Sequence, residues 1–209
     1  MDILQQYYPN LTERQQEQFA KLAPLYQDWN QKINVISRKD IDNVYEHHVL
    51  HSLAIAAVIR FRADAEILDL GTGGGFPGIP LAILFPDTKF TLIDGTLKKI
   101  KVVKAVAETL QLENVEAMQQ RAEELKKRRF DFVVSRAVAR LPQLVQWTER
   151  LIKSNHVHPL PNGLIALKGG RVQTEIKELP KGSYAELYPI SEFFEEAYFE
   201  EKFVVYVQR

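Results

Sequence analysis

The stretch that decides the fold class is Ile67-Leu68-Asp69-Leu70-Gly71-Thr72-Gly73-Gly74-Gly75-Phe76-Pro77-Gly78. A short apolar run, Ile67–Leu70, leads into four glycines among five residues, and a helix is expected to open near Pro77. Glycine reaches positive φ without strain and lets a ligand approach the backbone closely. In open α/β sheets, ligands bind outside the carboxyl ends of the strands. The stretch therefore predicts a ligand-binding turn between a buried parallel strand and a helix.

From residue 66 onward, runs typical of strands alternate with runs typical of helices. Such alternation predicts a mostly parallel, seven-stranded sheet with helices on both faces. No helix separates the last two strands, which indicates a closing hairpin with one antiparallel strand. The expected strands are Ile67–Leu70, Lys89–Ile93, Val115–Met118, Phe130–Ser135, Leu164–Lys168, Ala185–Ile190 and Phe203–Gln208. The expected helices are Ile79–Leu84, Leu97–Leu110, Ala122–Lys127, Leu141–Lys153 and Arg171–Leu179.

Residues 1–62 have the spacing of helices rather than of strands. Thr12 is a candidate helix cap, and a second helix is expected over Ile41–Phe61 after a turn at residues 34–40. We therefore expect a helical extension over residues 1–62 and one α/β domain over residues 63–209. The apolar residues that recur with helical spacing after Thr12 are Phe19, Leu22, Leu25, Tyr26 and Trp29.

Composition narrows the possible classes of protein. The chain has 209 residues with 27 Lys plus Arg against 27 Asp plus Glu, and this balance argues against non-specific coating of nucleic acid. It has no cysteine, which excludes disulfides, thiolate metal sites and a cysteine nucleophile. Residues 1–10 lack the pattern of a signal peptide, and no apolar run approaches the ~20 residues of a membrane span. We therefore expect a cytoplasmic protein without membrane contact.

Two cofactor classes fit the glycine-rich turn. Gly73, Gly75 and Gly78 have the G-x-G-x-x-G spacing of dinucleotide-binding turns, and Asp94 follows at the distance typical of that fingerprint. Asp69, two residues before the first glycine, would repel a pyrophosphate. The same carboxylate would attract the ammonium and sulfonium groups of S-adenosylmethionine. The residues therefore favour S-adenosylmethionine and leave a nicotinamide dinucleotide as the alternative.

Acidic residues also follow the second and third strands. A carboxylate at Asp94 can accept hydrogen bonds from both ribose hydroxyls, although an aspartate here can also cap the next helix. Arg121-Ala122-Glu123 follows the third strand, where the chain can close over an adenine. Glu123 is equally compatible with a first-turn helix acid that has no ligand.

Several motifs spread over nearly the whole chain occur together. The most specific is Gly73-Gly74-Gly75-Phe76-Pro77-Gly78-Ile79-Pro80-Leu81. The others are Trp29-Asn30, Asn34, His48-Val49-Leu50 with Ser52, Leu92-Ile93-Asp94, Lys99, Arg121-Ala122-Glu123, Ser135-Arg136-Ala137 and Leu167-Lys168-Gly169. Together these residues resemble the ribosomal small-subunit RNA methyltransferase G family, also called glucose-inhibited division protein B.

The resemblance implies a class I S-adenosylmethionine-dependent methyltransferase fold, Rossmann-like, with an N-terminal helical extension. It implies methylation of N7 of a guanine near the decoding centre of 16S ribosomal RNA in the small ribosomal subunit. It also implies cofactor contacts at Gly71 and Phe76, an adenine site at Ala122 and Glu123, and Arg136 at the mouth facing the substrate. The predicted cofactor-binding residues are Asp69, Gly71, Gly73, Phe76, Asp94, Ala122, Glu123 and Arg136, and the predicted catalytic residue is Arg136.

Methylation of guanine N7 fits the side chains available. N7 has an in-plane lone pair and no proton to lose, so the reaction requires alignment rather than a general base. Methylation of pyrimidine carbon-5 through covalent attack is excluded because there is no cysteine. Arg136 can donate two hydrogen bonds to guanine O6 or bind a phosphate, or it can form a structural ion pair. Lys168 can contact a phosphate or be solvated.

This sequence departs from the family pattern at a few positions. His47 and His51 stand where the family usually has Arg and Asp, and Leu97 stands where a glycine is common. His47 and His51 share a helix face, but no HExxH pattern accompanies them, so no metal site is expected. The alternatives to a methyltransferase are a nicotinamide-dependent oxidoreductase and a non-catalytic ribosome assembly factor. A monomer is expected.

Overall fold

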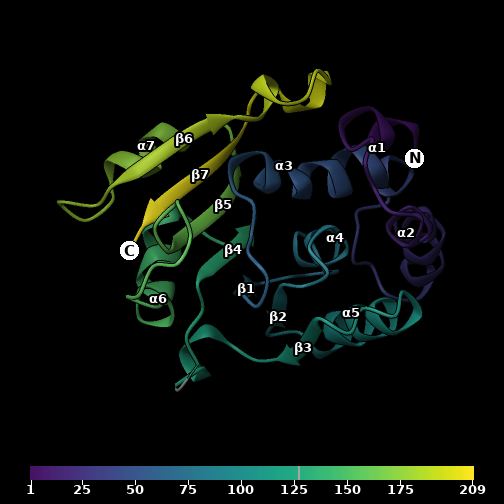
Figure 1. The fold of residues 1–209 in the computed structure, drawn as a ribbon, viewed down its shortest axis with the longest axis horizontal. Helices are drawn as coiled ribbons and strands as arrows, with labels where there is room; N and C mark the ends of the chain where they lie inside the picture. The colour runs from purple at the N-terminus through teal and green to yellow at the C-terminus, as the bar shows by residue number, and fades with distance from the viewer. Residues whose placement is uncertain (127) are drawn as a thin grey trace.

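The computed structural model describes residues 1–126 and 128–209, and a seven-stranded sheet runs through its centre (Figure 1). The strand order is β3-β2-β1-β4-β5-β7-β6. Strand β7 is antiparallel to both of its neighbours, and all other neighbouring pairs are parallel. The predicted α/β class and the antiparallel strand near the C-terminus are thus confirmed. The strands are β1 (Glu66–Leu70), β2 (Lys89–Asp94), β3 (Val115–Gln119), β4 (Phe132–Arg136), β5 (Gly163–Gly169), β6 (Ala185–Pro189) and β7 (Lys202–Gln208).

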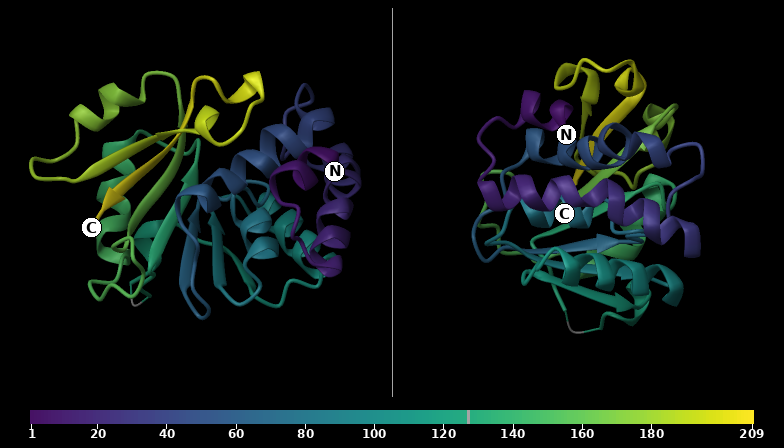
Figure 2. Two further views of the ribbon diagram at one scale, coloured as in Figure 1. Left: turned by 45° about the horizontal axis from the view of Figure 1, so that its top comes forward. Right: turned by 90° about the vertical axis from the view of Figure 1, so that its right-hand side faces the viewer.

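Helices cover both faces of the sheet, as Figure 1 shows, with α3, α4 and α5 on one side and α6 and α7 on the other. The central strands are apolar on both faces because both faces are covered. Helix α2 lies outside the first layer and faces the viewer in the right-hand view of Figure 2. The α-helices are α1 (Asp2–Tyr7), α2 (Glu13–Lys32), α3 (His51–Val58), α4 (Gly78–Leu84), α5 (Leu97–Thr109), α6 (Leu141–Thr148) and α7 (Val172–Lys177).

The N-terminal helices share a hydrophobic core with the sheet. Phe19 and Leu22 of α2 are fully buried in the same cluster as Phe90 and Leu92 of β2. Helix α2 begins after Thr12, the predicted cap, and Thr12 forms a capping box with Gln15. The division of the chain at residue 62 stays a prediction, although the helices before it and the strands after it are present.

Two predicted helices differ from the structure. The segment Ala122–Lys127 forms only one 3₁₀ turn, Ala122–Glu124, and Lys127 lies outside the described residues. At the start of this turn the Glu124 carboxylate accepts a hydrogen bond from the Arg121 backbone N–H. The segment Ile41–Phe61 is a 3₁₀ turn at residues 41–43, a π-helix at 44–50 and helix α3. A π-helix is rare and often lies at a functional site.

Two element ends also differ. The helix predicted to reach Lys153 ends at Thr148 and continues as a 3₁₀ turn at residues 149–151. Strand β4 begins at Phe132 because Phe130 pairs outside the sheet, in an isolated bridge with Ile152. Sequence periodicity does not distinguish these continuations from regular helix or strand.

The topology brings the predicted site residues to one edge of the sheet. Strands β1, β2, β4 and β5 are parallel, so their carboxyl ends lie at the same edge. The glycine-rich turn follows β1, Asp94 ends β2 and Arg136 ends β4. Ligands of open α/β sheets bind at this edge.

Candidate functional site

The glycine-rich turn between β1 and α4 has the backbone that its sequence predicts. Gly71, Gly73 and Gly75 all have positive φ, at 70°, 59° and 106°. The turn is closed by hydrogen bonds from the Gly75 and Phe76 N–H groups to the Thr72 carbonyl, each 2.9 Å long. No other heavy atom lies within 4 Å of the position that a Cβ would take at Gly73. Gly73 therefore faces open space, where a ligand can approach the backbone.

Asp69 holds both ends of this turn. Its Oδ2 accepts hydrogen bonds from the Thr72 hydroxyl at 2.6 Å and from the Gly78 N–H at 2.8 Å. Its Oδ1 is buried and has no partner among the described residues. Burial raises the pKa of Asp69 to about 7, against lowering contributions from the two hydrogen bonds and from Arg136. A buried carboxylate oxygen without a partner is costly, so this atom fits a cationic ligand.

Asp94 joins the end of β2 to the glycine-rich turn. Its Oδ2 accepts a hydrogen bond from the Gly73 N–H at 3.1 Å, and its Oδ1 accepts one from the Thr96 N–H at 2.8 Å. Lys99 Nζ lies 3.5 Å from Oδ2. The carboxylate thus lies beside the open face of Gly73, where it can accept further hydrogen bonds from a ligand, and it also holds Thr96, the residue before α5.

Ala122 and Glu123 differ in their exposure to solvent. Ala122 is buried, and its carbonyl accepts a hydrogen bond from Arg150 at 2.7 Å, whereas the Glu123 side chain is exposed. The hydrogen bond from the Gln120 N–H to the Asp94 carbonyl, 3.2 Å long, holds this segment next to the end of β2. The segment therefore lies at the predicted edge, and its contacts with a ligand stay a prediction.

Arg136 ends β4 and lies close to Phe76 of the glycine-rich stretch. It donates to the His47 carbonyl at 3.2 Å and to His48 Nδ1 at 2.9 Å, and its guanidinium lies 5.1 Å from the centroid of the Phe76 ring. Phe76 is buried, with its ring between Tyr26 and His48. Phe76 and the two histidines therefore fix the position of the Arg136 guanidinium. A cofactor contact by either Phe76 or Arg136 stays a prediction.

Tyr26 belongs to the site although the sequence predicted it only as a core residue of α2. Its hydroxyl donates to the Gly74 carbonyl at 2.6 Å, and the whole side chain is buried. Val35, after α2, packs against Gly74 from the same side. The amphipathic spacing of α2 identifies a buried face, but it gives no signal for this long-range hydrogen bond.

Replacing Tyr26 by phenylalanine is expected to lower the free energy of unfolding by about 1–2 kcal/mol, because the buried Gly74 carbonyl loses its donor. Denaturant unfolding followed by circular dichroism measures the change. Tyr184→Phe is the matched control, since the exposed Tyr184 hydroxyl contacts only the nearby side chain of Glu186. Equal stability of Y26F and the unaltered protein would contradict the role of Tyr26.

Lys168 is mostly buried and paired, which disfavours the expected solvated side chain, and a phosphate contact by Lys168 stays a prediction. Its Nζ lies 2.8 Å from Glu175 Oε2 and donates to the Ala139 carbonyl at 2.8 Å. The same carboxylate oxygen accepts a hydrogen bond from the Leu141 N–H. This pair ties the segment that follows β4 to α7. Within that segment, Val138 covers Gly71 so closely that a Cβ there would lie 2.4 Å from it.

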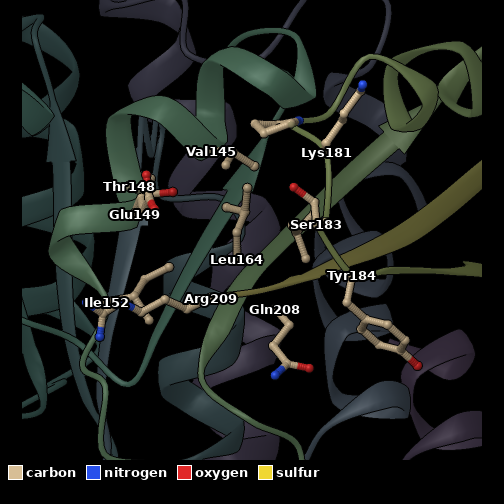
Figure 3. A pocket seen from close by; sticks show the side chains of 13 residues that line it. Val145, Thr148, Glu149, Ile152, Leu164, Lys181, Ser183, Tyr184, Gln208 and Arg209 are labelled. Carbon is tan, nitrogen blue, oxygen red and sulfur yellow. The ribbon is translucent and has the colours of Figure 1, made fainter.

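A cavity of about 350 Å³ lies at the opposite end of the sheet (Figure 3). Its walls come from α6, from the start of β5 at Leu164, from residues 180–184 and from the end of β7. None of the predicted site residues lines it. In the described residues, no group of three or more His, Asp or Glu side chains is placed to hold a metal ion. No helix in that same part of the chain is long and apolar enough to cross a membrane.

Comparison with solved structures identifies the fold. A S-adenosylmethionine-dependent methyltransferase from Aquifex aeolicus aligns with a TM-score of 0.58 at 14% identity, over 83% of this chain and 100% of that chain. Aeropyrum pernix fibrillarin, solved with S-adenosyl-L-methionine, aligns with a TM-score of 0.54 at 14% identity, over 75% of this chain and 73% of that chain. The fold is therefore that of a class I methyltransferase.

Comparison of sequences identifies the family. The family described as GidB, rRNA small subunit methyltransferase G, matches residues 15–194. Proteins named ribosomal RNA small subunit methyltransferase G are 58% identical in Flavobacterium psychrophilum, over 99% of this chain and 97% of the relative, and 55% identical in Bacteroides thetaiotaomicron, over the full length of both. The motifs that begin at Trp29 and end at Gly169 lie within the matched residues. The chain therefore belongs to the rRNA small subunit methyltransferase G family.

Proposed function

We propose that this protein transfers the methyl group of S-adenosylmethionine to N7 of a guanine in the decoding region of 16S ribosomal RNA. The observation that carries the cofactor part is the buried Oδ1 of Asp69, which has no partner in the described chain and belongs to the carboxylate that holds the glycine-rich turn through Thr72 and Gly78. Family membership supports the RNA substrate, because the relatives are named for methylation of small-subunit ribosomal RNA.

The site residues fit the cofactor by their chemistry. Asp69 offers a buried carboxylate oxygen to the ammonium and sulfonium groups of the cofactor. Gly73 leaves room for the cofactor to approach the backbone. Asp94 is placed to accept hydrogen bonds from ribose hydroxyls. The proposed contacts are Asp69, Gly71, Gly73, Phe76, Asp94, Ala122, Glu123 and Arg136, with Arg136 also at the substrate side of the site.

The same geometry disfavours a nicotinamide dinucleotide. A pyrophosphate bound over the turn would approach the Asp69 and Asp94 carboxylates, both of which contact this turn directly. Two acidic side chains next to a doubly charged pyrophosphate repel it, whereas they attract a cationic methyl donor. The methyltransferase interpretation is therefore preferred to the oxidoreductase interpretation.

The reaction needs positioning from the protein rather than proton transfer. When bound, S-adenosylmethionine supplies an electrophilic methyl group on a positively charged sulfur. The N7 lone pair forms the new bond to carbon as the carbon–sulfur bond breaks, its electron pair stays on sulfur, and no proton moves. The chain's task is to align the nucleophile with that bond and to exclude water. The buried Phe76 and the hydrogen-bonded Arg136 give this part of the site a fixed shape.

The partner that follows is the small ribosomal subunit or its 16S RNA. We also propose that the protein acts as a monomer in the cytoplasm, without a membrane or a metal ion. The balanced charge of 27 basic and 27 acidic side chains supports binding to a structured RNA site rather than non-specific coating of RNA.

Methyl transfer to small-subunit RNA tests this function. Purified protein, labelled S-adenosylmethionine and small ribosomal subunits lacking the modification are expected to yield one labelled guanine in 16S RNA. Mass mapping of RNA fragments locates the label, and the borohydride–aniline cleavage specific to N7-methylguanine identifies the atom. Binding to the subunits without any methyl transfer would instead support a non-catalytic assembly factor.

A further inference from the structure

A second cavity, of about 330 Å³, lies beside the proposed methyl-transfer site. It is lined by the carboxyl ends of β4 and β5, the start of β7 and the π-helix at residues 44–50. Neither the Gly71–Gly75 turn nor Asp94 contributes to its walls, and Arg136 joins the cavity to Phe76, 5.1 Å from the guanidinium. Its lining includes His47, His48, Arg136, Leu167, Tyr198 and Lys202.

Arg136 brings a partly buried positive charge to this cavity. Its hydrogen-bond acceptors are the His47 carbonyl and His48 Nδ1, both uncharged groups. Within residues 1–126 and 128–209, no carboxylate lies within ion-pair distance of Arg136 or of Lys202. A guanidinium has five N–H donors, and leaving even a partly buried cation without an anionic partner is unfavourable. The cavity is therefore built for a negatively charged ligand.

His48 adds an uncharged donor. Because Arg136 only donates, His48 Nδ1 must be the acceptor, and the ring proton of neutral His48 then lies on Nε2. This Nε2 is buried and has no partner in the described chain. Burial and the nearby Arg136 lower the pKa of His48 to about 3, so the ring is neutral near pH 7. An Nε2–H without an acceptor is a second group that an oxyanion would satisfy.

Lys202 supplies the second cation. Its Nζ lies 3.7 Å from the centroid of the Tyr198 ring, and His47 stacks on the same tyrosine with ring centroids 3.7 Å apart. His47 is in turn paired with Asp40 at 2.9 Å, so the Asp40 carboxylate is already used by a neighbouring side chain. The third cation in the lining, Lys168, is balanced by Glu175. Arg136 and Lys202 thus carry the excess positive charge.

The chemistry of the proposed reaction favours a phosphate over the guanine base as the ligand of Arg136 and Lys202. Attack by N7 leaves a positive charge on the guanine ring. A guanidinium and an ammonium placed directly against that ring would oppose this charge. A phosphodiester between them and the ring has the opposite effect, because its single negative charge attracts the two cations on one side and the ring on the other. The cavity also adjoins the site without containing any of the cofactor turn.

We propose that this cavity binds a phosphodiester of the RNA next to the target guanine, with Arg136 and Lys202 as the charged contacts and His48 as the neutral donor. This inference rests on the proposed function and extends it. The phosphate contact fixes the RNA backbone at the mouth of the site, so that the guanine enters with N7 toward the methyl group. Arg136 then acts as a substrate-binding residue.

Replacing Lys202 by glutamine tests the phosphate site. Binding of the protein to small ribosomal subunits is measured over a series of KCl concentrations. For K202Q we expect about tenfold weaker binding and a slope of log affinity against log salt that is smaller by about 0.7–1, as for the loss of one phosphate contact. Lys202→Arg is expected to retain both values. Lys89→Gln is the control, because Lys89 pairs with Asp64 at the start of β2, at the opposite edge of the sheet.

Calorimetry of S-adenosylmethionine binding tests whether the oxyanion in this cavity is the RNA phosphate or the carboxylate of the cofactor. If the anion is the RNA phosphate, K202Q binds S-adenosylmethionine as tightly as the unaltered protein does. Weaker cofactor binding by K202Q with an unchanged salt slope would overturn the inference and assign the cavity to the cofactor carboxylate. An unchanged slope together with unchanged cofactor affinity would also overturn it. Failure of the unaltered protein to methylate the subunits would instead contradict the proposed function.

Discussion

Replacing Gly73 by valine is expected to weaken binding of S-adenosylmethionine by at least about 100-fold, which corresponds to about 2.7 kcal/mol. Gly73 has a φ of 59° and no heavy atom within 4 Å of the position of a Cβ. The new side chain would therefore project into the space proposed for the cofactor and not into the protein core. A β-branched residue at this φ also strains the turn by about 1–2 kcal/mol. Calorimetric titration of the folded variant measures the loss.

Gly182 provides a control with the same backbone constraint. Its φ is 88°, and no heavy atom lies within 4 Å of its Cβ position, but it lines the cavity at the opposite end of the sheet. Gly182→Val therefore introduces comparable strain without filling the proposed cofactor site. Affinity within about twofold of the unaltered protein is expected for G182V. If G73V and G182V bound the cofactor equally well, the cofactor would not lie over Gly73.

The sheet was predictable because its strands are short, apolar and regularly separated. The run Ile67–Leu70 and the glycines after it locate β1 and its turn, and alternation with helices predicts parallel pairing for the strands that follow. Both signals are local in the sequence. For the same reason the edge that carries Asp69, Asp94 and Arg136 could be predicted, since each of these residues lies at or near the end of its strand.

The contacts that complete the site could not be predicted, because they join residues far apart in the sequence. Tyr26 has the spacing of an ordinary core residue, yet its hydroxyl binds the Gly74 carbonyl. The contact of Arg136 with His48 depends on a π-helix, which has no distinct hydrophobic period in a seven-residue segment. Lys168 resembles a solvated or phosphate-binding lysine until α7 places Glu175 against it. Tertiary packing, not local pattern, determines these pairs.

Replacing Asp69 by asparagine is expected to weaken S-adenosylmethionine binding by about 30-fold at pH 8, or about 2 kcal/mol, because a hydrogen bond to a charged group is lost. The asparagine oxygen can accept from Thr72 and Gly78 as the aspartate does. Its amide nitrogen then occupies the place of the partnerless Oδ1 and presents a donor to a cationic ligand. The turn is preserved while the attraction is removed. Calorimetric titration with S-adenosylmethionine measures the loss.

The pH dependence of binding distinguishes this role of Asp69 from a merely structural one. Burial raises the pKa of Asp69 from 3.8 to about 7, so the free folded protein keeps this carboxyl protonated at pH values where the unfolded chain has lost the proton. The contribution of Asp69 to the free energy of unfolding therefore falls as the pH rises from about 4 to about 7. A cationic ligand favours the ionised form and lowers this pKa, so binding near pH 6 releases a proton and affinity increases toward pH 8. Titrations in buffers of different ionisation enthalpy count that proton.

D69N is expected to show neither the proton release nor the increase in affinity. Asp131→Asn is the matched control, because the buried Asp131 carboxylate binds the Glu66 N–H and Lys153 instead of the glycine-rich turn, and this variant is expected to keep both effects. Equal affinity of the unaltered protein at pH 6 and pH 8, with no proton released, would mean that Asp69 does not interact with the charge of the methyl donor.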